Sequence, residues 1–544
     1  MRPVYKWIFI FCCVFIVSIA SNAAGKPGVY VQINPDNKWA ASDVLKSVES
    51  YYPAIDTSSP VIAGDFADPS IIRIGSAYYA AGTSSEWAPH FPIYKSNNLT
   101  DWKLITYVFP QKKSWMSSSF WAPELYYHNG KVYAYYTVRD TNNISCIGVA
   151  TAESPEKGFT DHGALIRTGK EAIDAFVFND SGQLYISWKA YGLDKRPIEL
   201  LSSKLSADGL KLEGEAFSIK KDEAGKGMEG QSIVKHNGYY YLFYSAGSCC
   251  GVPCTYNVRV SRSKSIKGPF EEFEQNPILK ENESWMCTGH GTPVSVPGGR
   301  WFYIYHAYEK QFNVFTGRQA LIAEIVWNDE SGWPSFKTSF NNNPKVSGNN
   351  SKVSASWTDD FVSTKLLPNW SWDFRHGDPY TKNENGTMVL SGKTKAGNIT
   401  GTVLCVRPIA GNYEIRTEVI NLNTALKGLV LYGDYNSAAG IGIKDTDVII
   451  WTVKNKKKEI LQTVKIKTAK SVKLKMVINE GHMLNFFYSM DGKDWLSMRI
   501  PGISPDGLDG SFLKQWDRSP RPGIIHQGNE SQPARFSYFT IINR

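Results

Sequence analysis

Five ionisable side chains recur at comparable positions along the first two thirds of the chain. Each precedes an apolar stretch, a turn that contains glycine, and a stretch rich in aromatic residues. They are Asp68, Glu124, Asp174, Glu229 and His290. Four carboxyl groups and an imidazole gathered in one cavity would serve chemistry and would not suit an apolar core. The residues therefore predict a reactive site, provided that the fold brings them together.

Three of these acids form the set that cleavage of a glycosidic bond requires. One protonated carboxyl donates to the leaving oxygen, and one carboxylate activates water or attacks the sugar directly. Asp68, Asp174 and Glu229 supply both groups and a third acid, which raises the pKa of the proton donor by charge repulsion and orients it. An inverting pair needs carboxyls about 6.5–9.5 Å apart, so a clearly shorter distance between Asp68 and Glu229 would indicate retention.

The turns that follow these residues define a repeat. Asn237-Gly238 is a strong hairpin signal, because a type I′ turn needs positive φ at both central residues. The five turn glycines are Gly75, Gly130, Gly182, Gly238 and Gly299. Their spacing of roughly fifty to sixty residues is close to that of propeller blades, and a lone hairpin cannot bury its apolar face. We expect an all-β fold, a five-bladed β-propeller followed by a β-sandwich, with the five ionisable residues directed at the propeller axis.

The acids also have structural interpretations. Asp68 precedes a proline and could form an Asx-turn, and Asp174 could cap a strand end. Glu229, among glycines, is harder to explain structurally. Pro123 would interrupt a central strand, so Glu124 is expected where a strand begins, at a rim, and most simply anchors its own loop. The equivalent placement of these residues in separate repeats favours the functional interpretation.

Two further residues keep alternatives open. Trp121 either forms a platform beneath a sugar ring or fills the interface between blades. His290 either ligates a metal on the channel axis, directly or through water, or is a hydrogen-bonded core histidine. Calcium is the candidate ion, although it prefers oxygen ligands and a direct histidine contact would be unusual. No other cofactor is expected.

Composition shifts divide the chain. Arg2 and Lys6 precede an apolar run that ends in small residues, which predicts a secretory signal peptide and a secreted or periplasmic protein without stable membrane insertion. An Asn- and Ser-rich stretch later separates two strand-rich regions. The expected divisions are a signal peptide at 1–23, a lead-in at 24–60 with a short helix near 40–50, the propeller at 61–340, a linker at 341–356 and the sandwich at 357–544.

Charge and cysteine content narrow the function further. The formal net charge is +9 over 544 residues, and the run Lys456–Lys458 is expected to be a solvated turn, so nothing suggests a nucleic-acid partner. A carbohydrate substrate and a monomeric state are expected. In an oxidising compartment, Cys249 or Cys250 could pair with Cys254 across a short loop.

At these residues the sequence resembles glycoside hydrolase family 43. The likeness spans about residues 61 to 334 and rests on an ordered set of motifs, each of which would be weak alone. The motifs are Ala67-Asp68-Pro69-Ser70, Trp121-Ala122-Pro123-Glu124, Ile173-Asp174, Glu229-Gly230, Gly238-Tyr239-Tyr240-Tyr241-Leu242-Phe243-Tyr244-Ser245, Arg262-Ser263 with Gly268-Pro269-Phe270, and Gly289-His290-Gly291-Thr292.

The resemblance implies a five-bladed propeller and an inverting mechanism. Asp68 would be the general base, Glu229 the general acid, and Asp174 would tune the pKa and orientation of that acid. His290 matches the axial histidine of the family, often near a bound calcium, and Arg318 falls where many members place an arginine that contacts the sugar. The C-terminal region looks like the concanavalin-like sandwich that accompanies many members.

Two hints about the substrate point in different directions. Ser248-Cys249-Cys250-Gly251 resembles a segment of arabinan-cleaving members, whereas an appended sandwich is more typical of exo-acting arabinofuranosidases and xylosidases. Gln231 and Ala175 stand where many members have proline. We therefore expect an inverting hydrolase of α-L-arabinofuranosyl or β-D-xylosyl linkages in plant polysaccharides. The alternatives are an endo-arabinanase, a galactan-acting hydrolase of the same family, or a non-catalytic carbohydrate-binding protein.

Overall fold

The computed structural model describes residues 59–167, 171–191, 197–337, 356–395, 397–467 and 470–544, together with the backbone of a short antiparallel pair, β1 (Val17–Ser21) and β2 (Pro27–Val31). The side chains of the predicted signal peptide and the predicted helix near 40–50 lie outside the described residues, as does nearly all of the predicted linker. The described chain is all-β, with two 3₁₀ turns, η1 (Asn313–Phe315) and η2 (Ser511–Leu513). Among the described residues, no helix has the length and apolar character needed to cross a membrane.

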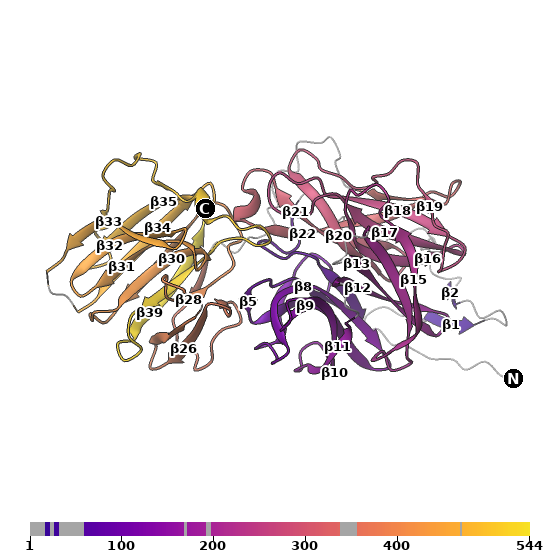
Figure 1. Cartoon of the computed structure of the whole chain (residues 1–544), viewed down its shortest axis with the longest axis horizontal. Coiled ribbons are helices and arrows are strands. Elements are labelled where there is room, and N and C mark those ends of the chain that lie inside the picture. Colours follow the sequence, from indigo (N-terminus) through magenta and orange to yellow (C-terminus); the bar gives the residue numbers. More distant parts are fainter. Residues whose placement is uncertain are drawn as a thin grey trace, which may run out of the picture. The chain divides into compact units, whose positions relative to one another are not determined.

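Residues 61–337 form five four-stranded antiparallel sheets, here called sheets 1 to 5 in chain order (Figure 1). Sheet 1 contains β3 (Ser70–Ile74), β4 (Ala77–Ala81), β6 (His90–Ser96) and β7 (Lys103–Phe109). Sheet 2 contains β8 (Met116–His128), β9 (Lys131–Asp140), β10 (Ser145–Ala152) and β11 (Thr160–Ile166). Sheet 3 contains β12 (Glu171–Asp180), β13 (Gln183–Tyr191), β14 (Glu199–Leu205) and β15 (Leu212–Lys221). Sheet 4 contains β16 (Met228–His236), β17 (Tyr239–Ala246), β18 (Asn257–Ser263) and β19 (Glu271–Glu272), and sheet 5 contains β20 (Trp285–Ser295), β21 (Trp301–Glu309), β22 (Arg318–Trp327) and β23 (Pro334–Lys337).

The sheets pack on one another through their faces. Separate apolar clusters join sheets 1 and 2, sheets 2 and 3, sheets 3 and 4, and sheets 4 and 5. Because the middle sheets are covered on both faces, strands such as β17 are buried almost throughout and do not alternate between apolar and polar residues. The first strands of successive sheets touch, and β20 of sheet 5 touches β3 of sheet 1. An isolated bridge between Ile62 and Ala320 adds a second link between the start and the end of this region.

Residues 356–544 form two further sheets that enclose a shared apolar core (Figure 1). One sheet contains β24 (Ser356–Asp359), β26 (Gly377–Asn383), β27 (Met388–Thr394), β29 (Tyr413–Val419), β34 (Val472–Asn479), β35 (Met483–Ser489), β36 (Leu496–Ser497), β37 (Leu508–Asp509) and β39 (Ala534–Asn543). The other contains β28 (Thr402–Cys405), β30 (Leu426–Asp434), β31 (Ser437–Lys444), β32 (Asp447–Lys454), β33 (Lys457–Lys465) and β38 (Arg521–Gln527). Buried Leu, Ile, Val and Phe side chains from both sheets fill the space between them, so this region is a β-sandwich.

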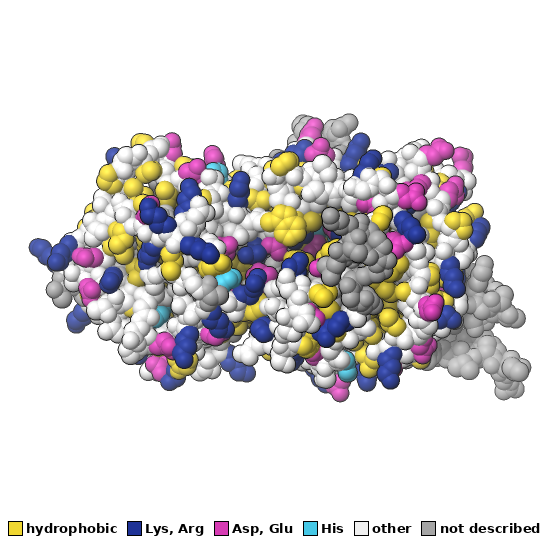
Figure 2. Space-filling view, in the orientation of Figure 1, with side chains coloured by type: hydrophobic (Ala, Val, Ile, Leu, Met, Phe, Trp, Pro, Cys, Tyr) yellow, Lys and Arg dark blue, Asp and Glu magenta, His cyan; other side chains and the backbone are white. Residues whose placement is uncertain are grey.

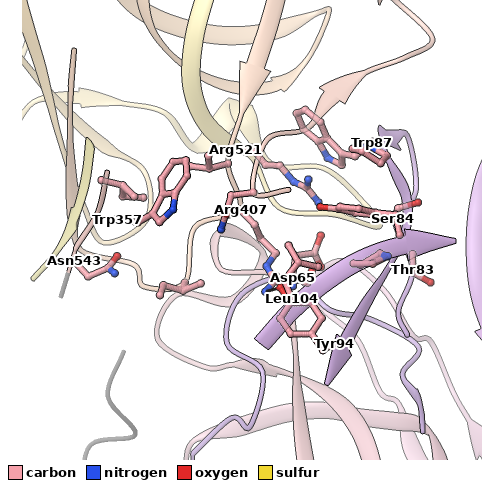
Figure 3. A pocket seen from close by; sticks show the side chains of 17 residues that line it. Asp65, Thr83, Ser84, Trp87, Tyr94, Leu104, Trp357, Arg407, Arg521 and Asn543 are labelled. Carbon is pink, nitrogen blue, oxygen red and sulfur yellow. Dashed lines mark hydrogen bonds between the residues drawn. The ribbon is translucent and has the colours of Figure 1, made fainter. Parts of the chain in front are cut away.

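Direct contacts link sheet 1 to the sandwich. Strand β5 (Trp87–Ala88) pairs with β25 (Trp372–Asp373) of the sandwich. The Arg407 guanidinium donates to the backbone carbonyl of Asp65 at 3.2 Å. A junction cavity of about 220 Å³ lies here (Figure 3), with Arg407 and Arg521 on the sandwich side and Asp65 and Trp87 on the other.

The molecular surface carries mixed charge. Figure 2 shows Lys and Arg side chains interspersed with Asp and Glu over the face that it draws. No single-sign field dominates this face, in keeping with the modest net charge of +9.

Candidate active site

Four of the five ionisable residues line one cavity of about 340 Å³. The cavity is also lined by two residues that the sequence assigned to substrate binding. The six predicted residues at the cavity are Asp68, Asp174, Glu229, His290, Trp121 and Arg318. They come from sheets 1 to 5, so the fold brings together side chains that lie up to 250 positions apart in the sequence.

Backbone irregularities in the first strands position these groups. Register shifts interrupt the pairing of β12 around Asp174, of β16 just after Glu229 and of β20 around His290. Asp174 has a φ of 60° and His290 a φ of 44°, and Asp68 just before β3 has a φ of 51°. Positive φ is uncommon for residues other than glycine, and bulges re-aim side chains next to functional sites. The sequence showed the residues but not these bulges.

Glu124 does not reach the cavity. It lies inside β8, which continues through Pro123 with register shifts, so the expectation that Glu124 begins a strand is wrong. Its carboxylate accepts a 2.6 Å hydrogen bond from the Ser70 hydroxyl of sheet 1. Burial raises its pKa to about 8. The prediction that all five ionisable groups converge on one cavity is therefore wrong for this residue, which anchors its strand to the neighbouring sheet.

Asp68 is held as a carboxylate by cations. Arg318 Nη1 lies 3.1 Å from Asp68 Oδ1, and the Thr83 hydroxyl donates to Oδ2 at 2.6 Å. Burial alone would raise the pKa of Asp68, but Arg318, His290 and His306 outweigh it and hold the pKa well below its usual range. The group is therefore ionised at neutral pH and can accept a proton.

Glu229 is paired with a residue that sequence reasoning missed. Lys189 Nζ lies 2.5 Å from Glu229 Oε2, and the Tyr256 hydroxyl donates to Oε1 at 3.0 Å. Burial opposes ionisation, but the Lys189 ammonium dominates and lowers the pKa of Glu229. Lys189 is a charged residue within a strand that is otherwise apolar around it, and that anomaly was the available signal.

Asp174 has the opposite protonation tendency. Burial raises its pKa to about 6, the charges of Glu229 and Asp68 add to this, and His290 and Lys189 oppose it. Its Oδ2 accepts the backbone N–H of Gly230 at 3.0 Å, next to Glu229 in the chain. Asp174 and Glu229 are thus coupled both by charge and through the backbone that carries Glu229.

His290 lies between two of the acids. Its Nδ1 is 3.5 Å from Asp68 Oδ1 and 3.7 Å from Asp174 Oδ2. The described residues contain no group of three or more His, Cys, Asp or Glu side chains arranged to hold a metal ion. The Nδ1 of His290 thus faces two carboxylates, whereas calcium prefers oxygen ligands. Direct ligation of the predicted axial calcium by His290 is therefore not supported by the described residues, and ligation through water stays a prediction.

A loop of the sandwich completes the cavity wall. Trp516, 60% exposed, and Asp517 both line the cavity. The Trp121 indole donates to Asp517 Oδ2 at 3.1 Å, and Arg318 Nη2 donates to the Asp517 carbonyl at 3.0 Å. Trp121 is half-buried here, at the cavity. The family resemblance allowed for a sandwich loop at the pocket, but the sequence did not identify its residues, because they lie about two hundred residues from Arg318 and carry no motif.

The cysteines near the site pair differently from the expectation. Disulfides join Cys249 to Cys250 and Cys254 to Cys287, so the predicted bond from Cys249 or Cys250 to Cys254 is wrong. The reason is spatial, because β20 brings Cys287 beside the loop that follows β17. Cys249 and Cys250 line the cavity.

The profile of glycosyl hydrolases family 43 matches residues 57–334, which include all the predicted site residues. This chain belongs to glycosyl hydrolase family 43. The profile of the β-xylosidase C-terminal concanavalin A-like domain matches residues 358–541. The protein is therefore a family 43 glycoside hydrolase with a concanavalin-like C-terminal domain, as the sequence motifs predicted.

Two relatives illustrate the likeness in sequence. The chain is 32% identical over 290 residues to the extracellular endo-α-(1→5)-L-arabinanase 1 of Bacillus subtilis. This alignment covers 49% of this chain and 87% of that protein. The chain is 29% identical over 305 residues to the extracellular exo-α-(1→5)-L-arabinofuranosidase ArbA of Cellvibrio japonicus, which covers 50% of this chain and 86% of that protein.

The whole two-part fold also occurs in solved family 43 structures. BlXynB of Bacillus licheniformis superposes with a TM-score of 0.76 over 89% of this chain and 99% of its own, at 22% identity. A xylan β-1,4-xylosidase of Bacillus halodurans gives a TM-score of 0.74 with the same coverage and identity. These likenesses concern the fold.

Proposed function

We propose that this family 43 enzyme is an inverting, exo-acting glycosidase that removes a terminal α-L-arabinofuranosyl or β-D-xylosyl residue from plant cell-wall polysaccharides or their oligosaccharides. The observation that carries the proposal is the meeting of Asp68, Asp174 and Glu229 in one cavity whose wall includes Trp516 of the sandwich. Asp68 is the general base, Glu229 the general acid, and Asp174 tunes and orients the acid.

The electrostatics support Asp68 as the base. Its low pKa keeps it ionised, and its carboxylate is fixed by Arg318 and Thr83, so water placed beside it has a positioned acceptor. A base with a low pKa is a weak proton acceptor, which suits a transition state in which the sugar already carries positive charge.

The acid role of Glu229 requires a proton that the Lys189 ion pair disfavours. Asp174, whose pKa is about 6, holds its carboxyl next to the Glu229 backbone and repels a charged Glu229. A sugar that enters the cavity would displace the Lys189 ammonium and exclude water. The repulsion from Asp174 and the loss of water would then raise the pKa of Glu229. Substrate binding and protonation of the acid are then coupled.

The wall formed by Trp516 and Asp517 supports exo action. An endo-acting enzyme needs an open groove on both sides of the scissile bond, whereas this loop of the sandwich lies at the cavity and is fixed to Trp121 and Arg318. Trp121 and Arg318 are then substrate-binding residues. Trp121 lines the cavity, with the Arg139 guanidinium 5.7 Å from the centroid of its ring, and would stack on the sugar through its other face, while the Arg318 guanidinium also fixes Asp68.

Two observations bear on which sugar is removed. The arabinan-acting relatives at 32% and 29% identity favour an arabinofuranosyl unit. The match of the sandwich to the C-terminal domain of β-xylosidases favours a xylosyl unit as the second candidate. We place arabinofuranosyl first, because the relatives at 32% and 29% identity are named for action on α-(1→5)-L-arabinosyl linkages.

The wider organisation is part of the proposal. We infer that sheets 1 to 5 are the blades of a five-bladed propeller spanning 61–340, and that a linker at 341–356 joins it to the sandwich at 357–544. A signal peptide at 1–23 and a lead-in at 24–60 precede it. We propose that the enzyme is secreted or periplasmic, which agrees with the extracellular relatives, and monomeric.

The test is hydrolysis of an aryl α-L-arabinofuranoside, an aryl β-D-xyloside and polymeric arabinan, with products identified by chromatography and the first-formed anomer by proton NMR. We expect a single monosaccharide of inverted configuration. Oligosaccharides from arabinan would indicate an endo-arabinanase, and a retained anomer would contradict the roles of Asp68 and Glu229. No release from any of the three would redirect the search to galactans and then to sugar binding without turnover.

A further inference from the structure

The loop between β17 and β18 carries an unusual disulfide. Cys249 and Cys250 are neighbours in the chain and are bonded to each other. A second disulfide joins Cys254 of the same loop to Cys287, 33 positions away on β20. Four cysteines thus serve one short loop, although only one of the two bonds connects it to another element.

The two bonds have different consequences for stability. A disulfide that closes a long loop restricts the unfolded chain, whereas one between adjacent residues restricts it very little. The Cys254–Cys287 bond therefore supplies the crosslink that holds the loop. The Cys249–Cys250 bond has no such role, and its location suggests another.

The vicinal pair lies in the wall of the active-site cavity. Both cysteines line it together with Asp68 and Glu229, and Cys250 is 7% exposed. Arg318 Nη1 donates to Cys250 Sγ at 3.5 Å while it lies 3.1 Å from Asp68 Oδ1. Through Arg318, the Cys250 sulfur is therefore close to Asp68, the group that would activate water beside the reacting sugar.

Charged and apolar side chains share the wall around the pair, and the apolar surface includes Trp121, Ile173 and Trp516. Charged side chains of Arg139, Lys189, Arg318 and Asp517 line the same cavity. An oxidised pair has no S–H to donate and presents polarisable sulfur, which packs favourably against apolar groups. A sugar ring carries hydroxyl groups at its edge and C–H bonds on its faces. The disulfide is therefore suited to contact a C–H face of the ring.

We propose that the Cys249–Cys250 disulfide is a binding surface for the C–H face of the sugar ring held beside Asp68. The proposal rests on the proposed function and deepens it, because it assigns part of the recognition of the glycosyl ring to a covalent pair of sulfurs. The pair then acts on binding of the sugar and not on proton transfer.

The experiment compares the enzyme with a Cys249→Ala/Cys250→Ala variant. Covering about 50 Å² of apolar surface corresponds to about tenfold in affinity. We expect kcat/KM for the accepted aryl glycoside to fall about tenfold, and the inhibition constant of the released monosaccharide to rise by a similar factor. Both limbs of the pH profile should stay in place. Cys405→Ala, a buried free cysteine of the sandwich, is the control for loss of a cysteine.

Three results would overturn the proposal. Unchanged kcat/KM and unchanged inhibition would show that the sugar does not use the pair. A shifted acidic limb with unchanged inhibition would show that the pair acts through Arg318 and Asp68 instead. A wild-type enzyme that neither hydrolyses nor binds arabinosyl and xylosyl compounds would overturn this inference and the proposed function together, whereas failure of the variant comparison alone leaves the function intact. If the alanine variant does not fold, Cys249→Ser/Cys250→Ser, which is closer to cysteine in side-chain volume, serves the same measurements.

Discussion

Lys189 Nζ lies 2.5 Å from Glu229 Oε2, so the proposed general acid is ion-paired in the free enzyme. Both side chains are largely buried, at 13% and 16% exposure, and the pair is therefore poorly screened by solvent. A general acid must carry a proton to act, whereas this pairing favours the ionised form. The position of the Lys189 ammonium would thus control whether Glu229 carries the proton that a general acid needs.

Removing that ammonium should move the pH profile. The proposed acid is active only when protonated, so kcat/KM falls as pH rises through the pKa of Glu229 in the free enzyme. Lys189 lowers this pKa, and Lys189→Met should raise it and shift the alkaline limb to higher pH. The measurement is kcat/KM against pH. The control is Lys204→Met, which changes an exposed lysine of the neighbouring strand β14. An alkaline limb that stays in place would contradict the role of Lys189.

The acid and the base should respond differently to the leaving group. Glu229→Gln removes the proton donor, so we expect a loss of about 10²–10⁴-fold with a poor leaving group and a much smaller loss with an activated aryl leaving group, which needs no protonation. Asp68→Asn removes the acceptor for water and should cost a similar factor with every leaving group. The test is kcat for a series of aryl glycosides. Equal losses for Glu229→Gln across the series would exclude it as the proton donor.

The sandwich loop should control substrate length. Trp516→Ala removes an exposed side chain, so the free energy of unfolding should change by less than about 0.5 kcal/mol. We expect KM for aryl glycosides to rise about tenfold, or ~1.4 kcal/mol in binding, and oligosaccharides to appear among the products from arabinan. Tyr380→Ala, a similarly exposed aromatic residue of the sandwich, is the control. A product profile identical to wild type would remove the argument for exo action.

That three acids meet in one cavity could be predicted from the sequence, whereas the side chains around them could not. Asp68, Asp174 and Glu229 could be found because each stands at a similar offset before a glycine turn, and that periodicity survives in the five sheets. Glu124 stands at a similar offset before its turn glycine, yet it lies outside the cavity. Its strand continues through Pro123, and its carboxyl group accepts a hydrogen bond from the Ser70 hydroxyl. A similar position in the sequence therefore does not determine where a side chain points, because a bulge can turn one side chain away from the cavity.

Contacts between the two parts of the fold left no trace in the sequence. Trp516 and Asp517 reach the cavity through tertiary packing, and no periodicity connects them with Trp121 or Arg318. The disulfide partners were missed for the same reason, since β20 brings Cys287 to Cys254 only after the sheets have packed. The local sequence pattern thus predicted the strands and the acids on them. The shape of the cavity depends on contacts between residues far apart in the sequence, which that pattern does not contain.

Asp65 connects Arg318, the partner of the proposed general base Asp68, to the sandwich loop, and replacement of Asp65 should reveal this connection. Its Oδ1 accepts the backbone N–H of Arg318 at 3.2 Å and its Oδ2 accepts that of Ser519 at 3.1 Å (Figure 3 shows Asp65 at the junction cavity). Asp65→Asn replaces one acceptor with a donor, which leaves a buried N–H without a partner at a cost of about 1–3 kcal/mol. We expect the melting temperature to fall and the Arg318 guanidinium to lose its fixed position.

The consequence for the reaction follows from the sign of the Arg318 effect. Arg318 lowers the pKa of Asp68, so a displaced guanidinium lets that pKa rise. The base must be ionised, and kcat/KM falls as pH drops through its pKa, so the acidic limb of Asp65→Asn should move to higher pH. Asp329→Asn, an exposed aspartate on a turn of sheet 5, is the matched control. A lower melting temperature with an unmoved acidic limb would restrict Asp65 to a purely structural role, because loss of packing alone does not change the charge beside Asp68.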